Sequence, residues 1–173
     1  GAYFRFNARC RAAGDRDEEK RMNGMFLTVF SVLSVFVFIG GMLCVFLVEP
    51  LVKNTFTSEE LFKLKIIMVL LTVNMMVTFV FNVVSMALQA YEKYAFIHLV
   101  TLLSGIITPI INIVALKIGG RAVAISAISL IISFTCYSIY LIYARKAICL
   151  EFSFCGFDTK VLKEIFVFSG FLF

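Results

Sequence analysis

Formal charge is scarce in this sequence. Only 16% of the 173 residues are Asp, Glu, Lys or Arg, whereas 61% are apolar; an ordinary soluble domain carries about 25% charged residues. No charged residue occurs between Ile66 and Tyr91, a run long enough for an α-helix to cross a bilayer. The scarcity of charge excludes an ordinary soluble domain and predicts an all-α integral membrane protein.

The residues from which catalytic and metal sites are built are also few. The chain has one histidine, His98, and neither an HExxH pair nor a glycine-rich phosphate loop. Its five cysteines lack the spacing of zinc or redox sites, so we expect reduced thiols. We therefore predict that the protein is not an enzyme and uses no metal or other cofactor. For His98, a structural role and a role in proton coupling both stay open.

Four apolar runs predict four complete transmembrane helices, at about 26–48, 66–89, 95–116 and 122–144. Residues 1–25 are predicted to be a basic cytoplasmic loop, 145–165 an amphipathic cytoplasmic linker, and 166–173 the start of a fifth span. Because the chain begins without methionine and stops inside an apolar run, we expect a fragment of a larger protein. The short link at 89–94 predicts that the second and third spans are antiparallel neighbours.

The 49–65 stretch contains a helix-start signal, Thr57-Ser58-Glu59-Glu60. We expect a short interfacial helix here, leading into the second span. In the first span, Gly40 and Gly41 permit either a bend or the close approach of a neighbouring helix.

Basic residues predict the orientation in the membrane. With residues 1–25, the 89–94 link and the segment after 144 on one side, that side holds eleven of the 16 Lys and Arg residues. The richer side should be cytoplasmic. All six tyrosines map near the same side, as an interfacial belt would. The net charge of +5 is thus explained by topology, and we expect no nucleic-acid partner.

The most informative polar residues lie inside the second span. They are Asn74, Thr78, Asn82, Ser85 and Gln89. Steps of three and four place these residues, here called the amide stripe, on one helix face. An amide left unsatisfied in hydrocarbon costs roughly 2 kcal/mol or more, so the stripe should meet protein or water. Two interpretations stay open: the stripe packs against other helices, or it lines a polar pathway for a substrate.

Other polar positions extend this prediction. In the third span we assign Thr108 and Asn112 to the same pathway; they share a face with His98, Thr101 and Gly105. In the fourth span, Ala122, Ser126, Ser129 and Ser133 form a small-residue face expected to pack against another helix. Near the N-terminus, Arg5, Arg9 and Arg11 are candidates for binding phosphate head groups. Simple retention of this segment on the cytoplasmic side is the alternative for the three arginines.

Three short motifs suggest a family. They are Arg5-x-Asn7-Ala8-x-x-Arg11-x-x-Gly14-Asp15, Leu88-Gln89-Ala90-x-Glu92-Lys93-Tyr94, and the helix 160–164 followed by Phe168-Ser169-Gly170. Their order and spacing resemble those of the polysaccharide biosynthesis (O-antigen and repeat-unit) flippases. That family belongs to the superfamily of lipid II flippases and multidrug and toxin extrusion transporters.

The resemblance implies a transporter of twelve to fourteen helices in the bacterial inner (cytoplasmic) membrane. This chain would be the part from the loop after the second helix to the start of the seventh. The implied substrate is a lipid-linked oligosaccharide on undecaprenyl pyrophosphate, flipped by alternating access. Membrane lipids and a coupling ion, H⁺ or Na⁺, are the other implied partners. A drug or metabolite exporter of the same superfamily, a membrane-embedded enzyme of glycan assembly and a purely structural membrane subunit remain alternatives.

Overall fold

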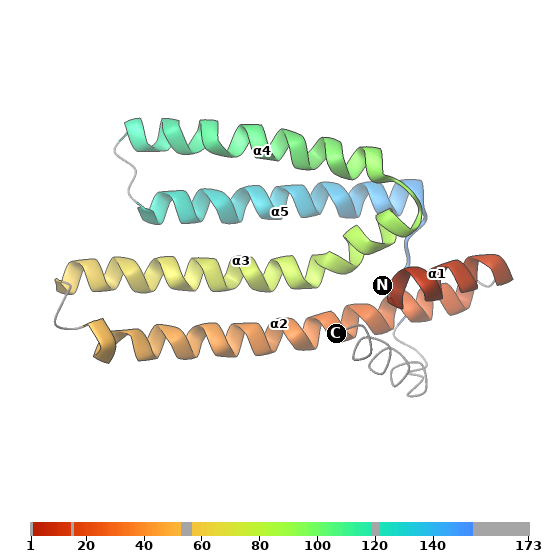
Figure 1. Cartoon of the computed structure of the whole chain (residues 1–173), viewed down its shortest axis with the longest axis horizontal. Coiled ribbons are helices and arrows are strands. Elements are labelled where there is room, and N and C mark those ends of the chain that lie inside the picture. The colour runs from red at the N-terminus through yellow and green to blue at the C-terminus, as the bar shows by residue number, and fades with distance from the viewer. Residues whose placement is uncertain (1, 15, 53–56, 119–121, 154–173) are drawn as a thin grey trace.

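The computed structural model describes residues 2–14, 16–52, 57–118 and 122–153, and within these ranges it contains α-helices and no strand. The helices are α1 (Ala2–Ala13), α2 (Arg16–Val52), α3 (Ser58–Ala90), α4 (Tyr94–Lys117) and α5 (Ala122–Ala147) (Figure 1). Helices α2 to α5 are each long and apolar enough to cross a membrane. The prediction of an all-α, multi-pass membrane fold is confirmed.

The helices extend beyond the predicted spans. Most of the segment 1–25, predicted to be a loop, is helical, because it contains α1 and the beginning of α2 at Arg16. Acidic residues in the first turn of α2 favour a helix start there. The span prediction missed this start because hydropathy marks only the part of a helix that crosses hydrocarbon. The amphipathic segment expected at 158–164 and the fifth span expected at 166–173 lie outside the described residues.

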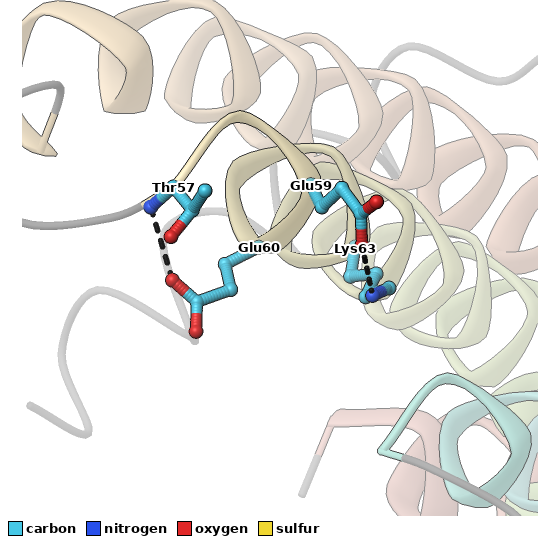
Figure 2. A network of polar contacts seen from close by, with 4 residues as sticks. All are labelled: Thr57, Glu59, Glu60 and Lys63. Carbon is cyan, nitrogen blue, oxygen red and sulfur yellow. Dashed lines mark hydrogen bonds and ion pairs between the residues drawn. The ribbon is translucent and has the colours of Figure 1, made fainter.

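Helix α3 starts where the sequence predicted. The backbone N–H of Thr57 donates a hydrogen bond of 3.0 Å to Oε2 of Glu60, and Nζ of Lys63 lies 3.3 Å from Oε2 of Glu59 (Figure 2). The first contact satisfies a backbone donor that the helix itself cannot satisfy, and the second is an ion pair between side chains one turn apart. The helix continues unbroken to Ala90, so the helix expected to lead into the second span forms the first turns of α3.

Helix α5 lies between α3 and α4 (Figure 1). Helix α3 packs mainly on α2 and α5, α4 packs mainly on α5, and α3 makes few contacts with α4. The prediction that the second and third spans are close neighbours is therefore wrong for most of their length. A short link fixes only the two helix ends that it joins, and side-chain packing decides which helices lie together beyond it.

The buried core is concentrated where α1, the start of α2 and the ends of α3 and α5 meet, here called the α1 end. Tyr3, Phe26, Leu88 and Ala144 are all buried there. Farther along the bundle, large apolar side chains are exposed, such as Phe46 of α2 at 73%. An apolar exterior of this kind is stable in lipid.

Helices α2 and α3 approach each other closely at Gly41. A Cβ atom at this position would lie 2.3 Å from Cγ2 of Thr72, whereas one at Gly40 would meet nothing within 4 Å. Helix α2 runs unbroken through both glycines. Of the two roles expected for this pair, close approach of a neighbouring helix is the one that the structure bears out.

Candidate functional site

The centre of the amide stripe lies opposite buried Ala87 of α3, and two packed residues flank the stripe: fully buried Leu88, and Phe81, whose ring stacks on Tyr137 of α5. At about 100° per residue, the stripe points away from the buried side chains of Val83, Val84 and Ala87. Thr78 is exposed, and the other four members of the stripe are half-buried. Two flanking apolar residues, Leu71 and Met75, are 49% and 57% exposed. The edge of the stripe beside Leu71 and Met75 thus lies on an open side of the described bundle.

Hydrogen bonding along the amide stripe is incomplete. The hydroxyl of Thr78 donates to the backbone oxygen of Asn74 at 2.9 Å, so its only proton is used within its own helix. The Oδ1 atom of Asn74 is buried and accepts no hydrogen bond from any described residue. Within the described bundle this oxygen is therefore an unsatisfied acceptor.

The polar face of α4 has a different environment, because it faces α5. A pocket of about 290 Å³, here called the hydroxyl pocket, lies between the two helices. Thr101, Ser104 and Thr108 of α4 line it together with Ser129, Ser133, Tyr137 and Tyr140 of α5. The hydroxyls of Thr101 and Tyr140 lie 3.2 Å apart in a hydrogen bond, and Tyr140 also lies 3.4 Å from the backbone oxygen of Ile97.

Several hydroxyls of the pocket donate their protons to the backbone. Ser104 donates to the oxygen of Thr101 at 2.9 Å, and Thr108 donates to the oxygen of Ser104 at 2.6 Å. Each hydroxyl has one proton and two lone pairs, so these side chains keep only acceptor capacity. At Ser104 and Thr108 the hydroxyl pocket is therefore suited to groups that donate hydrogen bonds, such as water or a ligand hydroxyl.

The residues assigned to one pathway by sequence are divided between two sides of the bundle. Thr108 lines the hydroxyl pocket, and Asn112, on the same helix, is half-buried with an Oδ1 atom that accepts no hydrogen bond from the described residues. Because α5 lies between α3 and α4, the structure does not bring Thr108 and Asn112 together with the amide stripe. His98 is exposed on α4.

Most residues of the hydroxyl pocket are absent from the pathway that the sequence predicts, among them Ser104, Tyr137 and Tyr140. Ser104 lies outside the predicted polar face of α4, and residue type alone places Tyr137 and Tyr140 in an interfacial belt. The steps of four and three that join Ser133, Tyr137 and Tyr140 place these hydroxyls on one helix face. That periodicity is the signal from which the α5 side of the pocket was predictable.

The three arginines lie on α1. Arg5 and Arg9 are exposed one turn apart, and the side chain of Arg11 lies outside the described residues. Their helix is held against α2 by a buried hydrogen bond of 2.7 Å from the hydroxyl of Tyr3 to Oδ1 of Asn23. Burial, followed by the nearby Glu19 carboxylate, raises the pKa of Tyr3 well above its usual value, so its hydroxyl stays a donor.

Glu19 connects three elements at the α1 end. Its Oε1 atom accepts hydrogen bonds from Nδ2 of Asn7 on α1, at 3.2 Å, and from the hydroxyl of Tyr91 after α3, at 2.6 Å. The segment after α5 is attached to the same end through Lys20. The Nζ atom of Lys20 lies 2.5 Å from Oε2 of Glu151, and its backbone oxygen accepts a hydrogen bond of 3.0 Å from the backbone N–H of Ser153. The structure thus gathers at one end the segments that the basic residues had assigned to one side of the membrane.

The described residues contain no group of three or more His, Cys, Asp or Glu side chains placed to hold a metal ion. Three cysteines in these ranges, Cys44, Cys136 and Cys149, have free thiols. Comparison of the chain with protein-family models, curated proteins and solved structures finds no match.

Proposed function

We propose that the chain is part of a membrane transporter whose substrate pathway runs along the amide stripe of α3. The observation that supports this most directly is the position of the stripe, which has one edge on an open side of the bundle and its centre opposite buried Ala87 of α3. Lipid cannot satisfy three side-chain amides. A water-filled pathway or a further part of the transporter would satisfy them.

The chemistry of the amide stripe favours a polar cargo without formal charge. Amides both donate and accept hydrogen bonds, and hydroxyl oxygens accept them, which suits the many hydroxyls of a sugar chain. The family resemblance adds the carrier: an oligosaccharide linked to undecaprenyl pyrophosphate and flipped across the bacterial inner membrane by alternating access, with H⁺ or Na⁺ as coupling ion. In this proposal Arg5 and Arg9, exposed on α1, and Arg11 of the same helix attract the pyrophosphate.

Replacing Asn82 with leucine tests this proposal. If Asn82 contacts the sugar chain, Asn82→Leu removes a hydrogen-bonding group from the pathway and should reduce export about tenfold. The measurement is the amount of surface polysaccharide in cells, together with the amount of this protein in the membrane.

Two control variants make the result interpretable. Asn82→Gln keeps the amide and should retain most of the export activity. Leu102→Ala, on the exposed apolar side of α4, should leave export unchanged. Normal export by Asn82→Leu at a normal protein level would contradict the proposed pathway.

A further inference from the structure

A second and larger pocket lies at the α1 end, away from both polar faces. Its volume is about 840 Å³, and its walls come from α2, α3, α5 and the segment after α5. Most of the lining is apolar and includes Leu27, Phe81, Leu141 and Phe152. Two charged side chains, Arg145 and Glu151, also line it. Pockets of roughly 300–1,000 Å³ are typical of ligand sites in proteins.

The two charges of this pocket are not equivalent. Glu151 pairs with Lys20 at 2.5 Å, and the hydrogen bond from Lys20 holds the pKa of Glu151 below its usual value. Arg145, exposed in the last turn of α5, has no ion-pair partner among the described residues. The pocket wall therefore carries one positive charge that is not neutralised beside it.

We propose that this pocket binds an anionic membrane phospholipid, with the phosphate on Arg145 and the upper part of one acyl chain against the apolar wall. A guanidinium binds phosphate oxygens through two parallel hydrogen bonds. The apolar lining excludes water from the chain, as an acyl chain requires. Helices that cross the membrane form the walls of the pocket, so the lipid arrives from the bilayer. This inference does not depend on the proposed transport function.

The absence of tryptophan from the chain allows a direct test by fluorescence quenching. Phe152→Trp places a single reporter in the pocket, and Leu102→Trp places one on the exposed apolar side of α4. Each variant of the full-length protein, with any tryptophan outside these 173 residues replaced by phenylalanine, is reconstituted into vesicles of phosphatidylcholine and phosphatidylglycerol, with bromine on the acyl chains of one lipid at a time. Quenching by bromine reports which lipid lies beside the tryptophan.

We expect the Phe152→Trp reporter to prefer phosphatidylglycerol by about threefold, the size of effect that a partly exposed ion pair produces. The Leu102→Trp reporter should show no preference. Adding Arg145→Gln should abolish the preference. Lys146→Gln removes the same charge from the same helical turn without changing the pocket lining, and should retain it. Circular dichroism of each variant establishes that its helices are intact.

Three results would overturn the proposal. Equal quenching by the two lipids at the pocket would show that it does not select an anionic lipid. If Lys146→Gln reduced the preference for phosphatidylglycerol as much as Arg145→Gln does, general surface charge, and not Arg145, would attract the lipid. Loss of the preference on adding inorganic phosphate at constant ionic strength would show that the site takes phosphate alone and does not need an acyl chain.

Discussion

Helices α3 and α4 carry polar residues at the same helical spacing but use them in different surroundings. On α4, hydroxyls such as Thr101 and Thr108 face α5, where Tyr140 and two serines complete a polar pocket. On α3, one edge of the amide stripe lies on an open side, and the Oδ1 atom of Asn74 receives no hydrogen bond from the described residues. A periodic polar pattern therefore defines a face, but the neighbouring helices decide whether that face is packed.

The orientation of the amide stripe is fixed by the contacts that α3 makes with α2 and α5. Thr72 fits against Gly41 of α2, and the ring of Phe81 stacks on Tyr137 of α5 with centroids 5.5 Å apart. Both contacts hold α3 in one rotation about its axis, and this rotation turns one edge of the amide stripe outward. Substitutions at the packed positions should therefore lower the free energy of unfolding more than substitutions in the amide stripe.

The largest expected effect comes from Gly41→Ala. The new methyl group would collide with Thr72, and overpacking of this kind costs about 1–3 kcal/mol. We expect the free energy of unfolding in detergent micelles to fall by this amount, because α2 and α3 must separate. Gly40→Ala is the control: its methyl group meets open space, so stability should hold or rise by up to about 1 kcal/mol. Equal losses in both variants would refute the close contact.

A smaller effect is expected from Tyr140→Phe, which deletes the hydroxyl shared with Thr101. Hydrogen bonds between membrane helices contribute about 0.6 kcal/mol on average and up to about 2 kcal/mol, so we expect a loss within this range in the same unfolding assay. Tyr143→Phe, one turn along, removes a hydroxyl that makes no hydrogen bond with the described residues, and should change stability less.

A substitution in the amide stripe, Asn74→Leu, is the variant to compare with Tyr140→Phe in the unfolding assay. Asn74→Leu removes an oxygen that accepts no described hydrogen bond, so the free energy of unfolding should change by no more than about 0.5 kcal/mol. A loss as large as that of Tyr140→Phe would mean that Asn74 is also a packing residue, and the contrast between α3 and α4 would disappear.

The helices were predictable from the sequence because their signals are local. Long apolar runs gave the four spans, and Thr57 with Glu60 gave the start of α3. The beginning of α2 was missed because Arg16 and the acidic residues after it are polar, and polarity ends a membrane span without ending a helix.

Contacts between distant parts of the chain were not predictable. Tyr91 meets Glu19 across 72 positions, and Tyr3 meets Asn23 across 20; neither pair has a spacing that marks it in the sequence. The place of α5 between α3 and α4 likewise depends on side-chain fit, of which the Phe81–Tyr137 stack is one instance. For this reason the sequence predicted which residues share a face of each helix, but not that α5 separates Thr108 and Asn112 from the amide stripe.

The most direct test of the central claim is the water accessibility of the amide stripe in membranes. After replacement of the native cysteines, of which Cys44 and Cys149 are exposed, single cysteines are introduced as Asn74→Cys, Asn82→Cys and Gln89→Cys. Leu102→Cys and Ile106→Cys, on exposed apolar positions of α4, are the controls. If a water-filled pathway runs along α3, a small water-soluble thiol reagent should label the three stripe positions and leave both controls unmodified. The absence of labelling at all five positions would contradict the pathway and would make the amide stripe a packing surface.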